Sequence, residues 1–284
     1  MSRFVEVAVN DARLVPYRNL RQHPAGRSRD RGHFVVEGRW VVQRLLASGH
    51  QVESIVIEAG RDVSELGPIP PQTELFRLSK EQIRQLAGFD FHRGVLACAV
   101  RKPFGKLQHW KPRGLALAAI GVTDMQNLGS MLRSAAAFGI RDILLDDSTV
   151  DPYARRVVRV SMGAALTGRY FELSDPIADL RDLAAGRADV LAATLGENSV
   201  DVQTFSAEGR PIVLVVGNEA LGLPSDVQEV ASHCVRIPMP GAGGNDPGNG
   251  ELPQDATSAV DSLNVSVAAA ILMYELTRCR SRSG

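Results

Sequence analysis

The stretch PIVLVVGNEALGLP, residues 211–224, passes from a continuous apolar segment directly into a polar turn rich in glycine. An apolar run without polar alternation is typical of a strand that is covered on both of its faces. Gly217 exposes the backbone at the end of this strand, and Asn218 and Glu219 place polar groups there. The stretch therefore predicts an inner strand of a parallel sheet, with a ligand-binding loop at its carboxyl end.

The segments before and after this strand repeat its pattern. Further apolar strands are predicted at LALAAIGV, DILL, DVLAAT and CVRIPM, and helices at 128–138, around 153–161, at 176–185, after Pro224 and at 265–278. Such alternation predicts an α/β fold in which a mostly parallel sheet has helices on both faces. Because ligands of these sheets bind at the carboxyl ends of the strands, we expect the functional site in the loops after IGV, VVG and IPM.

The N-terminal part of the chain predicts a second, smaller α/β unit. Strand-like and helix-like segments alternate between Phe34 and Val100, and the stretch RKPFGKLQHWKPRG then interrupts all periodicity with prolines, glycines and cations. Such a break is typical of a linker between domains. The predicted division is residues 1–102 for the N-terminal domain, 103–113 for the linker and 114–284 for the C-terminal domain.

The composition is that of an ordinary soluble protein, and we expect two modest domains and a location in the cytoplasm. The chain has 284 residues, of which 44% are hydrophobic and 23% charged, and no apolar run approaches the roughly 20 residues that cross a bilayer. The start, MSRFVEVAVND, has no basic region followed by an apolar stretch, so we expect no secretory signal. Cys98, Cys234 and Cys279 are odd in number and widely spaced, which disfavours both a disulfide framework and paired zinc ligands.

The charge of the chain is balanced overall but unevenly distributed. The 32 basic and 32 acidic residues give no electrostatic argument for nucleic acid as a partner of the whole molecule. Nine arginines nevertheless lie between Arg3 and Arg44 against four acids, and four more lie between Tyr153 and Tyr170. A guanidinium group suits phosphate and stacks on bases. Each cluster is explained equally well by a solvated surface and by a phosphate-binding one.

The loop TDMQNLGSMLRSAAAFG, residues 123–139, joins a predicted strand to a predicted helix. Asn127 is placed to cap the backbone amides of the first helical turn, and Gly129 lets the chain turn closely. Arg133 falls about one and a half turns into a helix of mostly apolar and small residues, so it either extends to water or meets an anion. Capping alone explains Asn127, whereas Arg133 leaves open either an extension to water or a contact with an anion.

The stretch SLNVSVAAAILMYEL, residues 262–276, opens with surplus polar residues. Ser262, Asn264 and Ser266 stand at the mouth of an apolar helix, and one cap suffices for a helix. Glu219 also has a purely structural explanation, because a carboxylate in the first turn of a helix is favoured by the helix dipole. Three polar loops at neighbouring strand ends favour a shared pocket over three independent caps. The glycines of VVGNEALGLP match the spacing of neither a dinucleotide-binding fingerprint nor a phosphate-binding loop with its lysine.

With these loops established, the sequence resembles the SpoU (TrmH-type) RNA 2'-O-ribose methyltransferases of the SPOUT class. The resemblance rests on NLGSMLRSAAAFG, on VVGNEALGL, and on IPM followed by SLNVSVAAAILMYEL, in the family's order, and it covers residues 115–278. The segments FVVEGRWVVQRLLASG and HRGVLACAV resemble, more loosely, the family's ribosomal-protein-like RNA-recognition domain. The resemblance implies a deep trefoil knot in the C-terminal domain and a homodimer whose active sites lie near the subunit interface.

The resemblance also implies roles for particular residues. The catalytic positions of the family fall on Arg133, Asn127, Glu219, Ser262 and Asn264. The positions that would bind the methyl donor, S-adenosylmethionine, fall on Leu195, Gly196, Gly217, Asn218, Ile237, Met239 and Leu263.

The implied reaction needs alignment of the reacting atoms and removal of the hydroxyl proton, without a metal. In the family the arginine takes part in activating the ribose hydroxyl. Because the pKa of a guanidinium lies above roughly 12, holding a phosphate or stabilising an alkoxide is physically easier for Arg133 than acting as a base. Both roles stay open.

The implied function is methylation of RNA, with 23S ribosomal RNA as the expected substrate because a separate module suits the recognition of folded RNA. Transfer RNA is the alternative substrate, and a non-catalytic RNA-binding protein is the alternative class. A dinucleotide-dependent enzyme is disfavoured, since no G-x-G-x-x-G follows a strand. One departure from the family is the insertion at residues 240–261, whose Gly, Pro, Asn and Asp content predicts a mobile loop. We expect it to be either a lid or an inert insertion.

Overall fold

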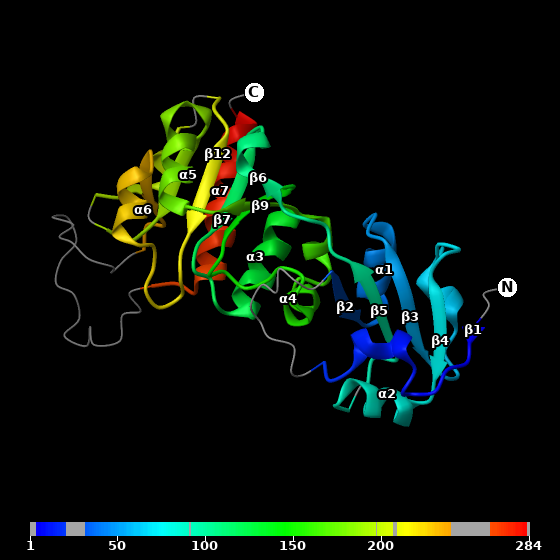
Figure 1. The fold of residues 1–284 in the computed structure, drawn as a ribbon. Coiled ribbons are helices and arrows are strands. Elements are labelled where there is room, and N and C mark those ends of the chain that lie inside the picture. The colour runs from blue at the N-terminus through cyan, green and yellow to red at the C-terminus, as the bar shows by residue number, and fades with distance from the viewer. Residues whose placement is uncertain are drawn as a thin grey trace, which may run out of the picture.

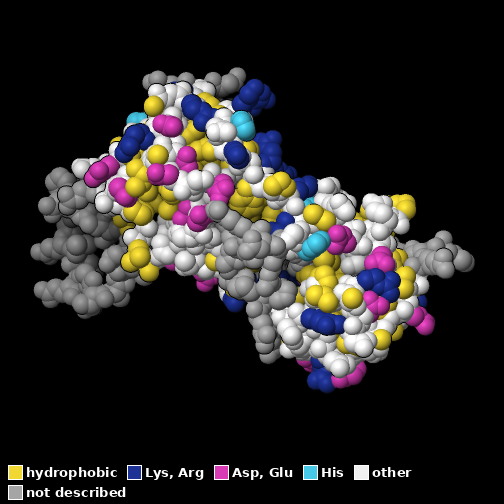
Figure 2. Space-filling view, in the orientation of Figure 1, with side chains coloured by type: hydrophobic (Ala, Val, Ile, Leu, Met, Phe, Trp, Pro, Cys, Tyr) yellow, Lys and Arg dark blue, Asp and Glu magenta, His cyan; other side chains and the backbone are white. Residues whose placement is uncertain are grey.

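The computed structural model of the protein describes residues 4–20, 32–90, 92–196, 198–206, 209–239 and 262–282. Two β-sheets build two lobes (Figure 1). Acidic and basic side chains are interspersed on the face of the molecule that Figure 2 shows. The predicted insertion at 240–261 lies outside the described residues. In the described part of the chain, no helix has both the length and the apolar character that crossing a membrane requires.

The N-terminal lobe is a five-stranded sheet with the strand order β1-β4-β3-β5-β2. Strand β4 pairs in parallel with β1 and β3, whereas β5 pairs antiparallel with β2 and β3. The elements of this lobe are β1 (Phe4–Val5), η1 (Ala12–Tyr17), β2 (His33–Glu37), α1 (Arg39–Ala47), β3 (Val52–Glu58), η2 (Val63–Leu66), β4 (Glu74–Leu78), α2 (Lys80–Ala87) and β5 (Val95–Val100).

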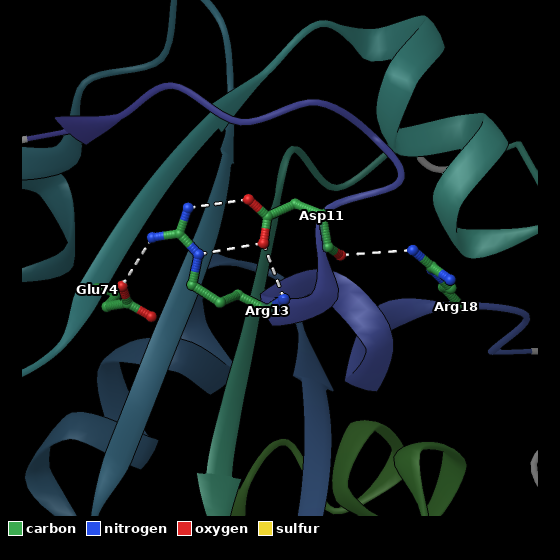
Figure 3. A network of polar contacts seen from close by, with 4 residues as sticks. All are labelled: Asp11, Arg13, Arg18 and Glu74. Atoms are coloured by element: carbon green, nitrogen blue, oxygen red, sulfur yellow. Dashed lines mark hydrogen bonds and ion pairs between the residues drawn. The ribbon is translucent and has the colours of Figure 1, made fainter.

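A network of ion pairs and hydrogen bonds ties the 3-10 helix η1 to strand β4 of this sheet (Figure 3). Asp11 caps η1 by accepting a hydrogen bond from the backbone N–H of Arg13 at 2.9 Å. The Arg13 guanidinium donates to both carboxylate oxygens of Asp11 and reaches Glu74 on β4 at 3.1 Å. Hydrogen bonds from Arg13 lower the pKa of Asp11 to about 2. Arg18 also donates to the Asp11 carbonyl oxygen, at 3.4 Å.

The C-terminal lobe is an eight-stranded sheet with the order β11-β13-β10-β12-β7-β8-β9-β6. Every pair of neighbouring strands in the described part of this sheet is parallel. The strands are β6 (Gly105–Lys106), β7 (Leu115–Ala119), β8 (Asp142–Asp146), β9 (Arg169–Leu173), β10 (Asp189–Ala193), β11 (Val200–Asp201), β12 (Ile212–Val216) and β13 (His233–Arg236). The helices are α3 (Met125–Ala137), α4 (Arg155–Val160), α5 (Pro176–Asp182), α6 (Ser225–Val230) and α7 (Val265–Arg282), with short turns η3 (Leu107–His109), η4 (Ala164–Thr167), η5 (Leu183–Arg187) and η6 (Val202–Thr204).

Helices cover both faces of this sheet, as the continuous apolar strands predict. Leu117 on β7 belongs to a core shared with α3, α4 and α7, whereas its neighbour Ala118 belongs to a core shared with α5 and α6. Successive side chains of a strand point to opposite faces, so a strand packed on both sides must be apolar throughout. The predicted α/β fold with a mostly parallel sheet is confirmed. The predicted trefoil knot stays a prediction.

The start of α3 differs from the predicted one. The helix begins at Met125, three residues before the predicted start at 128, and its cap is Asp124, whose carboxylate accepts from the backbone N–H groups of Gln126 and Asn127. The prediction that Asn127 caps this helix is therefore wrong. Asn127 lies inside the first turn, where its side chain is free to make other contacts.

Part of the predicted linker packs on the C-terminal sheet. Strand β6 pairs with β9, and the buried Trp110 donates its indole N–H to Asp142 at 3.0 Å. The two sheets are thus joined by the few residues between Val100 and Gly105.

An aromatic cluster lies where the two lobes meet. The His50 ring, in the turn between α1 and β3, packs 5.4 Å from Phe34 of β2 and 5.6 Å from Tyr153, which precedes α4. Its Nδ1 is 2.8 Å from Ser48 Oγ, while Nε2 is buried without a hydrogen-bond partner among the described residues. Burial, together with the nearby Lys102 charge, lowers the pKa of His50 from 6.5 to about 4.

This shift predicts a loss of stability in acid. His50 is neutral in the folded protein, so its contribution is complete above pH 6.5 and is lost as the pH falls from 6.5 to about 4. We predict that His50→Phe loses about 1–2 kcal/mol less unfolding free energy than wild type over this range. Urea denaturation at about pH 7 and pH 4.5 measures the difference, with His109→Gln at an exposed histidine as the control. Equal pH dependence in wild type and His50→Phe would contradict the prediction.

Candidate active site

Hydrogen bonds join the three polar loops at the carboxyl edge of the parallel sheet. The side-chain amide of Asn127, on α3, donates to Glu219 Oε1 at 3.0 Å. The side-chain amide of Asn264, just before α7, donates to Asn127 Oδ1 at 3.0 Å. Glu219 follows β12, so residues from three separate segments form one connected network.

Glu219 and Asn264 also satisfy the backbone around them. Glu219 Oε1 accepts from the backbone N–H of Asp124 at 3.2 Å, directly before the N-terminus of α3, where a helix dipole favours negative charge. Asn264 Oδ1 accepts from the backbone N–H and the hydroxyl of Ser266, at 2.9 and 2.6 Å, and so caps α7. Each side chain therefore both orders its own loop and contacts the next one.

The loop after β12 is folded tightly back on itself. The backbones of Asn218 and Gly222 exchange two hydrogen bonds of 3.0 Å. A Cβ atom at Gly217 would lie 2.4 Å from the Gly222 carbonyl oxygen, so only glycine fits there. The Asn218 side chain donates to the Gly121 carbonyl at 2.8 Å and accepts from the backbone N–H groups of Ala220 and Leu221.

A cavity of about 370 Å³ lies between the loop after β12 and the segment that leads into α7. It lies beside the ends of β10, β12 and β13 and the start of α7. Of the residues predicted from the sequence, its lining contains Leu195, Gly217, Asn218, Glu219, Ile237, Met239, Ser262 and Leu263. The cavity size is within the range of small-molecule sites, and its position matches that of ligand sites in parallel sheets.

Four predicted residues do not line this cavity. Asn127 and Asn264 lie behind Glu219 and hold it, and Gly196 follows the lining residue Leu195. Arg133 is exposed on α3 and makes no ion pair with the residues that the structure describes. It follows Asn127 by six residues, a rotation of about 600° around the helix, so the two side chains leave α3 on different sides.

Sequence reasoning missed other lining residues. Thr194, Gln228 and Arg236 contribute to the cavity, as does Leu221, whose side chain is 88% exposed at its rim. Thr194 directly follows the apolar strand DVLAA and could have been noticed as a polar residue at a strand end. Gln228 and Arg236 lie within α6 and β13, and their spacing in the sequence gives no signal of a site.

A buried polar brace supports the loop between β7 and α3. The carboxylate of Asp146 accepts from the backbone N–H groups of Gly121 and Thr149, each at 3.1 Å. Thr149 Oγ1 in turn accepts from the Val122 N–H at 3.2 Å. Asp146 and Thr149 are buried, so their hydrogen bonds fix the segment that leads to Asp124 and, through it, to Glu219.

The fold and the site together define an α/β protein with a cavity of small-molecule size at the carboxyl edge of a parallel sheet. The sequence model of the SpoU rRNA Methylase family matches residues 114–244. An uncharacterised tRNA/rRNA methyltransferase of Mycobacterium bovis is 31% identical over 280 residues, which are 95% of this chain and 90% of that protein. The chain therefore belongs to the SpoU rRNA methylase family of RNA methyltransferases.

Two further relatives extend the comparison. The 23S rRNA (guanosine-2'-O-)-methyltransferase RlmB of Acinetobacter baylyi is 31% identical over 241 residues, covering 79% of this chain and 88% of that protein. The AdoMet-bound rRNA methyltransferase of Sinorhizobium meliloti has a TM-score of 0.75 and 25% identity, covering 97% of this chain and 98% of that one.

The Asn127–Glu219 hydrogen bond can be tested by exchanging the amide and the carboxylate between the two positions. Asn127→Asp places a carboxylate beside Glu219, where two like charges about 3 Å apart repel. We predict a loss of about 2 kcal/mol of unfolding free energy. The double variant Asn127→Asp/Glu219→Gln restores an amide donor to the pair and should recover most of the loss. Urea denaturation of the four proteins measures this. An unchanged loss in the double variant would show that the two side chains do not interact.

Proposed function

We propose that the protein transfers a methyl group from S-adenosylmethionine to a ribose 2'-hydroxyl of RNA in the cytoplasm, with 23S ribosomal RNA as the substrate. The observation that carries this proposal is the cavity between the second and third motif loops, whose wall residue Glu219 is held by Asn127 of the first motif. Membership of the SpoU rRNA methylase family supports methylation of RNA, and the similarity to RlmB supports the 2'-oxygen as the acceptor.

The cavity suits the methyl donor chemically. Leu195, Ile237 and Leu263 offer apolar surface for an adenine ring. Gly217 lines the cavity without a side chain, so a ligand can approach the backbone closely there. Glu219 contributes a carboxylate, which matches the positive charge of a sulfonium donor. When bound, S-adenosylmethionine supplies an electrophilic methyl group.

The chain's own residues would position the acceptor. Glu219, held by Asn127 and by the Asp124 N–H, is available to accept a hydrogen bond from the ribose at the cavity wall. Ser262 lines the same cavity and offers a hydroxyl. Arg133 is assigned to the phosphate next to the reacting ribose or to the developing alkoxide, because a guanidinium does not give up its proton at neutral pH.

A homodimer would bring Arg133 to a cavity. Helix α7 carries the exposed apolar side chains Val267 and Tyr274, which are 47% and 49% exposed, and the Tyr274 ring lies 6.0 Å from that of Phe138 at the end of α3. Exposed apolar groups on adjacent helices favour association with a second copy. We propose that α3 and α7 form this interface and that Arg133 of one protomer completes the site of its partner.

Transfer RNA is the alternative substrate, since the relatives include tRNA/rRNA methyltransferases. The N-terminal lobe, proposed here as the RNA-recognition domain of residues 1–102, favours ribosomal RNA because shape recognition of folded RNA needs surface beyond the catalytic cavity. A non-catalytic RNA-binding protein is the second alternative. It would show no affinity for S-adenosylmethionine in calorimetry.

We predict that Arg133→Ala lowers methyl transfer at least a hundredfold while leaving donor affinity within about twofold, because the arginine acts on the RNA and not on the donor. Transfer from tritiated S-adenosylmethionine to separate ribosomal and transfer RNA fractions measures activity and substrate together, and calorimetry measures donor binding. The control is Arg181→Ala, at an exposed arginine of α5. Wild-type turnover in Arg133→Ala would contradict the role proposed for Arg133. Label in transfer RNA alone would make transfer RNA the substrate in place of ribosomal RNA.

We predict that Val267→Asp converts the protein from dimer to monomer, because the change places a charge in an apolar interface. Sedimentation velocity measures the state of association. Val15→Asp, at a valine that is 55% exposed on η1 of the other lobe, is the control and should leave the dimer intact. A monomeric wild-type protein, or a dimeric Val267→Asp, would contradict the proposed interface.

A further inference from the structure

A buried carboxylate joins the two lobes. Glu37, the last residue of β2, is 3% exposed. It pairs with Arg155 and, at 2.9 Å, with Arg159, both on α4 of the C-terminal lobe. Arg93, in the N-terminal lobe, approaches the same carboxylate at 3.8 Å. Three guanidinium groups thus converge on one acid among the residues that the structure describes.

This junction carries an excess of positive charge. One carboxylate balances one guanidinium, and the neighbouring acids Glu65 and Asp151 are bound by their own arginines, Arg39 and Arg101. The side chains of Arg93 and Arg159 are 51% and 37% exposed, so part of the uncompensated charge faces water. Exposed guanidinium groups in excess of their acids attract anions, and phosphates above all.

An exposed tryptophan follows Glu37 closely in the chain. Trp40 is in the first turn of α1, three residues after Glu37, and is 59% exposed. The guanidinium of Arg39 stacks over its ring at 4.5 Å. The other tryptophan of the chain, Trp110, is only 4% exposed. An exposed indole next to an arginine is a platform on which an unpaired base can stack.

We propose that the arginine seam, defined as Trp40, Arg93, Arg155 and Arg159, binds a single-stranded segment of the substrate RNA. The guanidinium groups hold its phosphates and Trp40 stacks on one unpaired base. This inference rests on the proposed function, which supplies RNA as the partner. It assigns to a surface built from both lobes a contact that neither lobe provides alone.

The seam is linked directly to the candidate active site. Helix α4 packs against α3 so closely that a Cβ atom at Gly129 would lie 2.7 Å from the Val160 Cβ. Asn127 and Arg133 lie on that same helix α3. RNA held at the seam is therefore fixed relative to the helix that carries these residues, which is how a remote contact orients a reacting group.

Tryptophan fluorescence tests the seam without knowledge of the natural substrate. Because Trp110 is buried, quenching of intrinsic emission by a twelve-residue oligouridylate reports on Trp40. We expect quenching in wild type and its loss in Trp40→Phe. In anisotropy with the labelled oligonucleotide, Trp40→Ala should weaken binding about tenfold, whereas Trp40→Phe, which keeps an aromatic ring, should stay within about threefold of wild type.

A charge variant tests the phosphate contact. Arg93→Gln should weaken binding and reduce the slope of log affinity against log salt concentration by about 0.7–1. Arg210→Gln is the matched control, because Arg210 is also a half-exposed arginine paired with one acid, Asp189, but lies at the amino-terminal edge of the sheet. The control should retain the wild-type slope.

The outcomes separate this inference from the proposed function. If the seam is right, Trp40→Ala raises the KM for ribosomal RNA about tenfold, with kcat and donor affinity near wild type. Normal methyl transfer with wild-type oligonucleotide affinity in both Trp40→Ala and Arg93→Gln would overturn the seam alone, as would a wild-type protein that does not bind the oligonucleotide. A wild-type protein without affinity for S-adenosylmethionine would instead overturn the proposed function.

Discussion

The site depends on the side-chain amide of Asn127, which acts both as a hydrogen-bond donor and as an acceptor. Asn127 donates to Glu219 and accepts from Asn264, and by these two bonds it fixes the positions of loops that follow different strands. Asn127 is buried, so a replacement without both a donor and an acceptor would leave its partners unsatisfied. The shape of the cavity beside Glu219 is set by this shared amide together with the tight turn at Gly217.

Much of the fold follows from the sequence because its signals are local. Continuous apolar strands such as IVLVV require cover on both faces, and the two cores of the C-terminal lobe provide it. The start of α3 was missed because Asp124 and Asn127 are both good caps and stand three residues apart. The ordered part of the predicted linker was missed because Trp110 bonds to the distant Asp142, a contact that no local pattern announces.

The site was predicted to a similar extent, and for similar reasons. Glu219 and Leu263 line the cavity because polar loops at the ends of parallel strands must meet at one edge of the sheet. Arg133 does not line it, because no described residue of α3 reaches the cavity, and six residues of helix turn its side chain away from Asn127, which holds Glu219. Arg236 and Gln228 depend on how β13 and α6 pack against their neighbours, and residue type alone does not encode that.

The strand order also constrains how the protein is made. Strand β7 lies at the centre of the large sheet, yet Leu115 pairs with Ile212 of β12, which the ribosome synthesises much later. The central strands therefore wait with apolar surface uncovered until most of the chain has emerged. The small N-terminal sheet closes with residues up to Val100 and completes its pairing earlier. Synthesis thus delivers a folded first lobe attached to an unfinished second one, and during that interval the nascent chain depends on protection from aggregation.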